Sequence, residues 1–350
     1  MDFRGDRSSS RPAALALFLA GFAWLAAPAA AQPVSDAARA DYELAARWNS
    51  AYTDALGHCL TASSEPYQAL QSAMSARVVG PRFQAQMKLS IEESLKDYGR
   101  CRAALVALDT PTFSGLPTDS EFQPVRMISY ALSMHDVLRS LTLEFPTILK
   151  AISTGNAVQF EALVGKNMKN MVLLFGTQSK MTQARSAVID PALSERDMLA
   201  AVDGYFRTAA RIYRAHPLMG KPRLDLALAT ELDGLAAELN EHMRSGVAKL
   251  DRELGFVMAR QAESQAAGDE NGVLVASRMI AATELSRPAF TEGANLATAI
   301  KARAVRYRKL AFSVNEFNAM VQELTTIMGR IAAARQRAAA AAAGLQRVES

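Results

Sequence analysis

Helical periodicity is the feature that most constrains this chain. After about residue 35, apolar residues recur every three or four positions, which is the spacing of one face of an α-helix, and no alternating strand pattern competes with it. The longest periodic stretch is 223–267, and a second covers 317–334. In the first stretch the apolar residues form a near-heptad stripe: Leu232, Leu235, Leu239, Met243, Val247, Leu250, Leu254 and Val257. The sequence predicts an all-α fold, an elongated multi-helix bundle of long antiparallel helices.

Turn and capping residues predict where these helices end. One helix is expected to end at Gly155 and the next to begin at Asn156, because glycine suits a helix C-terminus and asparagine suits an N-cap. Pro288 lacks the backbone N–H that a helix interior needs, so we expect separate helices at 273–285 and 289–310.

The chain could form one bundle or two abutting helical lobes. Asp190–Pro191 is the best boundary, with an N-terminal helical lobe over 32–190 and a C-terminal, coiled-coil-like lobe over 191–350. Ser194 with Asp197 is then expected to open the first helix of the second lobe.

Residues 1–31 have the pattern of a secretory signal peptide. A basic segment is followed by the apolar stretch Ala13–Ala27 and by the small-residue site Ala29–Ala31. We expect cleavage after Ala31, with an uncleaved membrane anchor as the alternative. The bias toward alanine and arginine is typical of a GC-rich bacterium, so the expected location is the periplasm of a Gram-negative cell.

Cys59 and Cys101 are the only cysteines in the chain. Exported proteins meet an oxidising compartment, and the pair lacks the spacing of a redox, haem or zinc motif. We therefore predict a structural disulfide in the N-terminal lobe.

Motifs that carry catalysis or hold a cofactor are absent from the sequence. It contains no Gly-x-Ser-x-Gly, His-Glu-x-x-His, P-loop or Gly-x-Gly-x-x-Gly. Glu92, Glu93 and Asp97 are the acids an enzyme hypothesis would use, but one sequence places no histidine beside them. We predict no catalytic residue, metal or cofactor.

Two candidate ligand sites remain, and each has a simpler interpretation. His135, Met168, Met171 and Phe175 could line an apolar pocket for a lipid or haem-like molecule, or they could be ordinary core. Glu238 and His242 lie one turn apart, with Glu231 on the same face, and could bind a metal or form a solvated helix face.

A basic amphipathic segment lies near the C-terminus. Lys301, Arg303, Arg306 and Lys309 carry its charge, which would suit an anionic envelope surface. A nucleic-acid partner is not expected for an exported protein. The alternative is a charged face balanced by neighbouring acids.

The leading hypothesis is an exported, soluble, non-enzymatic α-helical protein that acts by protein–protein or envelope-surface interaction. The partner would be an unknown protein or a second copy, held through the heptad stripes; Leu324 belongs to the second stripe. The alternative is a periplasmic helical bundle that holds an apolar small molecule.

Overall fold

The computed structural model describes residues 44–45, 47–59, 62, 66, 80–113, 122–187, 189, 191–216 and 224–346. The predicted signal peptide at 1–31 and Asp190 of the predicted lobe boundary lie outside these residues. A helical segment at 47–59 precedes α3 (Pro81–Val106), α4 (Pro124–Ser153), α5 (Ala157–Ala187), α6 (Ser194–Ala215), α7 (Leu226–Ala267), α8 (Glu270–Tyr307) and α9 (Val314–Gln346). Every regular element in the described part of the chain is a helix, so the predicted all-α bundle is confirmed.

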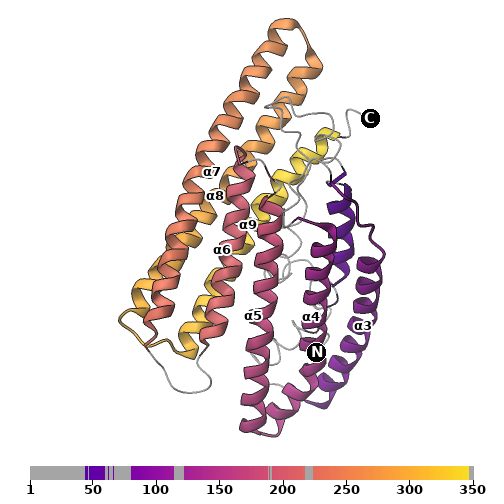
Figure 1. The fold of residues 1–350 in the computed structure, drawn as a ribbon, viewed down its shortest axis with the longest axis vertical. Coiled ribbons are helices and arrows are strands. Elements are labelled where there is room, and N and C mark those ends of the chain that lie inside the picture. Colours follow the sequence, from indigo (N-terminus) through magenta and orange to yellow (C-terminus); the bar gives the residue numbers. More distant parts are fainter. Residues whose placement is uncertain are drawn as a thin grey trace.

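Each helix packs on its neighbour in chain order, and the molecule is elongated along the helix axes (Figure 1). In addition, α6 contacts α8 and α9. The long antiparallel hairpin of α7 and α8 extends past the other labelled helices at one end of the molecule (Figure 1).

The apolar residues form two main clusters. One lies among α6, α7, α8 and α9, and the other lies among segment 47–59, α3, α4 and α5. Met171 of α5 packs against both clusters, so α5 connects them. The chain therefore has two apolar cores that touch at α5. The position of the lobe boundary at Asp190–Pro191 remains a prediction.

Both predicted heptad stripes are buried within the chain. Leu232, Leu239 and Leu250 of α7 and Leu324 and Ile331 of α9 belong to the α6–α9 cluster. These side chains pack against the chain's own helices, so the stripes are core and not surface.

The turn at Gly155 and Asn156 forms as predicted. Gly155 has a φ of +64°, in the left-handed region that glycine tolerates, and the Asn156 side chain accepts a hydrogen bond from the Gln159 amide at 3.0 Å. The prediction for Pro288 was wrong, because α8 runs through it without a break. Ala289 and Phe290, which follow this exposed proline, are buried in the core and hold both halves of α8 in place.

Cys59 and Cys101 form the predicted disulfide, with their Cα atoms 5.2 Å apart. The bond joins segment 47–59 to α3 inside the second cluster, beside the buried Tyr52 and Tyr98. In the described part of the chain, no helix combines the length and apolarity needed to cross a membrane.

Candidate functional site

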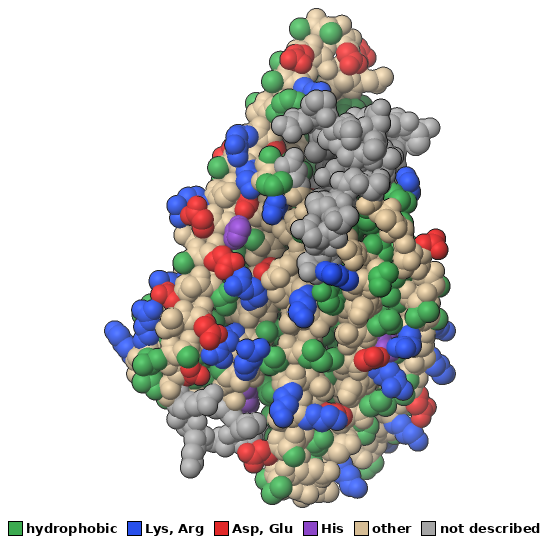
Figure 2. Space-filling view, viewed as in Figure 1, with side chains coloured by type: hydrophobic (Ala, Val, Ile, Leu, Met, Phe, Trp, Pro, Cys, Tyr) green, Lys and Arg blue, Asp and Glu red, His purple; other side chains and the backbone are tan. Residues whose placement is uncertain are grey.

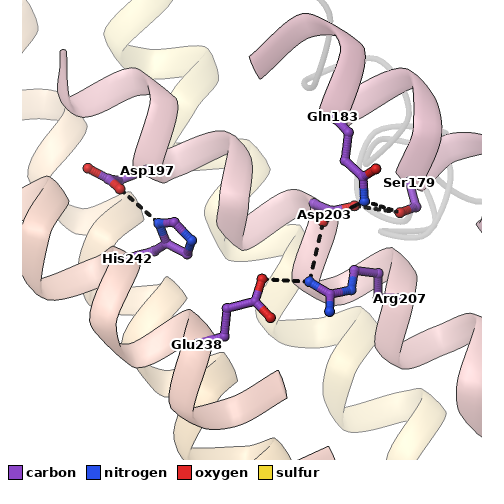
Figure 3. A network of polar contacts seen from close by, with 7 residues as sticks. All are labelled: Ser179, Gln183, Asp197, Asp203, Arg207, Glu238 and His242. Carbon is purple, nitrogen blue, oxygen red and sulfur yellow. Dashed lines mark hydrogen bonds and ion pairs between the residues drawn. The ribbon is translucent and has the colours of Figure 1, made fainter. Parts of the chain in front are cut away.

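Asp197 of α6 is the centre of a polar contact with α7. Its Oδ1 accepts a hydrogen bond from His242 Nδ1 at 2.9 Å, and its Oδ2 accepts from Ser245 Oγ at 3.1 Å and from Lys249 Nζ at 2.6 Å. Burial alone would raise the pKa of Asp197, but the bonds from Lys249, His242 and Ser245 outweigh it and lower that pKa. An ionised carboxylate with three donors therefore joins the two helices, and Figure 3 shows its contact with His242.

A second polar group links α5, α6 and α7. Asp203 Oδ1 accepts from Ser179 Oγ at 2.5 Å, and Gln183 Nε2 donates to both Asp203 oxygens at 3.2 and 3.3 Å. Arg207 lies between Asp203, at 3.8 Å, and Glu238 of α7, at 2.6 Å (Figure 3). Burial raises the pKa of Asp203, while the bonds from Ser179 and Gln183 act to lower it. The Arg207 guanidinium is thus fixed from two sides.

A groove of about 490 Å³ lies over this second group, between α5 and α7. Small residues form part of its lining: Gly176 of α5, Ala210 of α6 and Gly234 of α7. A Cβ atom added at Gly176 or Gly234 would meet nothing within 4 Å, so the groove is open above both positions.

The charged lining of the groove comes from two helices. Arg207, Arg211 and Arg214 recur at i, i+4 and i+7 on α6, which places them on one face. Glu231 of α7 forms an ion pair with Arg211, as Glu238 does with Arg207. Arg214 is exposed and forms no ion pair with any described residue.

Neither a catalytic triad nor a metal site is formed by these side chains. Ser245 donates to Asp197 and not to His242, so the hydroxyl lacks the general base that nucleophilic catalysis needs. No group of three or more metal-binding side chains occurs within the described ranges. Glu231, Glu238 and His242 were expected to bind a metal or to form a solvated helix face. Their side chains are 52%, 48% and 42% exposed, so they do face solvent, and each also contacts α6.

The four predicted pocket residues fall in different surroundings. His135 of α4 is buried, with Nδ1 at 2.8 Å from Asp136 Oδ1 and Nε2 at 3.0 Å from the Tyr98 carbonyl oxygen. Both ring nitrogens therefore already face protein oxygens, which leaves neither open toward haem. Phe175 packs against Tyr205, with ring centroids 6.1 Å apart, in the α6–α9 cluster.

The two methionines of that set pack against the cluster that contains Phe175. Met168 and Met171 are partly buried and pack against the α6–α9 cluster. Met171 also packs against the cluster formed by segment 47–59, α3, α4 and α5. The structure thus places three of the four residues in core packing around α5.

The basic segment is paired with acids of its own chain. Arg303 contacts Glu316 at 3.1 Å and Glu323 at 2.8 Å, and Arg306 contacts Glu316 at 2.6 Å. Lys301 forms an ion pair with Asp233 of α7, and Arg308 contacts the same carboxylate at 2.8 Å. These contacts link α8 to α7 and α9 and reduce the charge the segment offers to an anionic surface.

Lys309, the remaining member of the predicted anionic-surface set, follows α8 and is exposed. It is in none of the ion pairs that hold Lys301, Arg303 and Arg306 within the described part of the chain.

The end of the α7–α8 hairpin is a second candidate site. The backbone amide and the hydroxyl of Ser194, the first residue of α6, donate to Glu253 of α7 at 2.6 and 2.9 Å. Along α7, therefore, α6 reaches only as far as Glu253. Among the described elements α7 contacts only α6 and α8, so past Glu253 it pairs with α8 alone. We call residues 254–284, the part of the hairpin beyond that level, the arm.

Sequence reasoning missed most of this site. Asp203, Arg207 and Lys249 carried no motif, although the i, i+4, i+7 spacing of the α6 arginines was a usable signal. Fold and site define an all-α bundle with a charged groove over α6 and a projecting arm. No family model, curated protein or solved structure matches the chain.

Proposed function

We propose that this chain is an exported, non-enzymatic α-helical protein that acts by protein–protein contact, and that the arm is its contact element. The observation that carries the proposal is the length over which α7 extends past α6. From Glu253 to the end of α7 at Ala267 the helix continues for about 20 Å at 1.5 Å per residue. Over that length α8 is its only neighbour among the described helices.

A helix in a two-helix hairpin buries one side and leaves the rest exposed. On the arm, Phe256 is 46% exposed, Met258 53% and Leu274 41%. Val257 and Ala276, by contrast, are buried. Docking of a partner helix along the arm would remove exposed apolar area from water at about 25 cal/mol per Å².

The tip of the arm is polar, which suits an element that stays in solution until it meets a partner. Asp269 caps α8 by accepting from the Gly272 amide at 2.9 Å, and Glu270 follows it in the first turn. Figure 2 shows acidic side chains at this tip. The heptad stripes are not available for the contact because they are buried in the chain's own core.

Export rests on the signal-peptide pattern of residues 1–31. The Cys59–Cys101 disulfide supports it, since disulfides persist in oxidising compartments. The alternative, binding of an apolar ligand in the interior, has less support because His135 already has a protein oxygen at each ring nitrogen.

Site-specific photo-crosslinking in the native host tests the proposal. A photoreactive phenylalanine analogue at Phe256, Met258 or Leu274 is expected to give a discrete higher-mass adduct. Leu89 of α3 and Val125 of α4 are also exposed apolar positions and serve as matched controls that give none. An adduct of twice the chain mass would identify the partner as a second copy. Adducts of equal yield from the controls, or none from the arm, would refute the arm as the contact.

A further inference from the structure

The groove over α6 has opposite charge character at its two ends. At one end, the Arg207 guanidinium is shared between two carboxylates, those of Asp203 at 3.8 Å and Glu238 at 2.6 Å. With the buried Asp203 counted, which is not part of the lining, two carboxylates face one guanidinium at this end. The Glu238 side chain is about half exposed, so its oxygens remain accessible from the groove.

At the other end the balance is reversed. Arg214 lines the groove, is exposed and forms no ion pair with a described residue. Arg211, between the two ends, is neutralised by Glu231. The groove is therefore negative near Glu238, neutral in the middle and positive near Arg214.

The separation of the two ends sets the size of a ligand. Arg207 and Arg214 are seven residues apart on one helix, which corresponds to about 10 Å along the axis. An extended peptide advances about 3.3–3.6 Å per residue, so three residues span this length. The volume of about 490 Å³ lies within the range of about 300–1,000 Å³ that is usual for ligand sites.

We propose that this groove binds a short zwitterionic peptide of about three residues in an extended form. Its ammonium group lies beside Glu238, and its carboxylate lies on the Arg214 guanidinium, whose planar N–H donors suit a carboxylate. Gly176, Ala210 and Gly234 leave room for the peptide backbone along the lining. The fixed Arg207 holds Glu238 in position through their ion pair.

Isothermal titration calorimetry of the purified chain with tri-alanine tests the proposal. We expect saturable binding with a Kd below about 1 mM. Acetylation of the peptide N-terminus and amidation of its C-terminus are each expected to weaken binding about tenfold or more, because each removes one charge-assisted contact. Failure of tri-alanine to bind, or equal binding of the doubly capped peptide, would overturn the proposal.

Pairing variants with capped peptides assigns each end. Arg214→Gln is expected to weaken tri-alanine about tenfold and to leave the affinity for tri-alanine amide unchanged. Glu238→Gln is expected to behave the same way toward the N-acetyl peptide. Glu241 and Arg244, an exposed ion pair on α7 outside the groove, supply control variants with no effect. Equal losses for free and capped peptides would refute the assigned orientation.

Filling the groove gives an independent check that does not remove a charge. Gly234→Leu places a side chain in open space and is expected to abolish tri-alanine binding without lowering the melting temperature. Gly255→Leu on the same helix is the matched control, since a Cβ there also meets nothing within 4 Å. Undiminished binding by Gly234→Leu would show that the peptide binds elsewhere and would overturn the proposal.

Discussion

Removing the Asp197 carboxylate is the sharpest test of how α6 and α7 are held together. The Asp197 side chain is 6% exposed and the Lys249 side chain 15% exposed, so both charges lie largely out of water. Asp197→Ala leaves the Lys249 ammonium without its carboxylate, 2.6 Å away in the native chain. Breaking one partner of a buried ion pair typically costs about 3–5 kcal/mol.

The lower end of that range applies here. His242 is 42% exposed and can form a hydrogen bond with water in the variant, so the loss of its bond to Asp197 adds little to the change in the free energy of unfolding. We expect Asp197→Ala to lower the free energy of unfolding by about 3 kcal/mol. Replacing both partners, as in Asp197→Ala with Lys249→Met, leaves no buried charge, so the double variant should recover about 2 kcal/mol of that loss.

Urea unfolding followed by circular dichroism measures these values. The exposed pair Asp251–Arg287, at 2.7 Å, is the control, and Asp251→Ala should cost less than about 1 kcal/mol. An Asp197→Ala loss no larger than this control, or a double variant less stable than Asp197→Ala alone, would show that the buried-charge reasoning is wrong.

The same variant predicts a pH dependence. The lowered pKa of Asp197 means that the folded protein binds this proton less tightly than the unfolded chain does, whose aspartate pKa is about 3.9. The stabilisation by ionised Asp197 is therefore complete at a pH above the pKa of the unfolded chain. It is lost as the pH falls through the lower pKa of Asp197 in the folded protein. The stability difference between the native chain and Asp197→Ala should be constant from about pH 6 to 8 and should narrow below about pH 4.

Three further outcomes are expected from unfolding experiments. Cys59→Ser, which breaks the bond to Cys101, should cost about 2–4 kcal/mol in urea unfolding, and the same loss should follow reduction of the native chain. Gly246→Ala should cost about 2 kcal/mol in thermal unfolding, because its Cβ would collide with the buried ring of Phe290. Gly255→Ala, in open space on the same helix, is its control and should stabilise the fold by about 0.5–1 kcal/mol. Leu324→Asp should unfold the isolated chain, read by circular dichroism, since this residue is 2% exposed in the core; a folded variant would contradict the assignment of its stripe to the interior.

Much of the fold could be predicted from the sequence because its signals are local. Helical period, the glycine at 155 and the asparagine at 156 depend on residues within one or two turns of each other. Pro288 was misjudged because its effect depends on what the flanking residues contact, and Ala289 and Phe290 are held by a core built from distant segments.

The candidate site was harder to predict because its partners are far apart in sequence. Ser194 and Asp197 have the spacing of a helix start, yet Ser194 donates to Glu253 and Asp197 accepts from side chains 45 or more positions away. A single-sequence pattern shows which residues share a helix face but not which helix that face meets. For the same reason Glu238 and His242 were recognised as a pair while their partners on α6 were not.

The order in which the helices pack has a consequence for how the chain acquires its structure. Because successive helices are neighbours in space, most tertiary contacts span short stretches of chain, and such low contact order is associated with rapid folding. Cys59 and Cys101 both precede α4, so the covalent link needs less than the first third of the chain to have emerged from a ribosome or a translocation channel. Each later helix then finds its docking surface already present, and the chain can fold in the direction in which it is made.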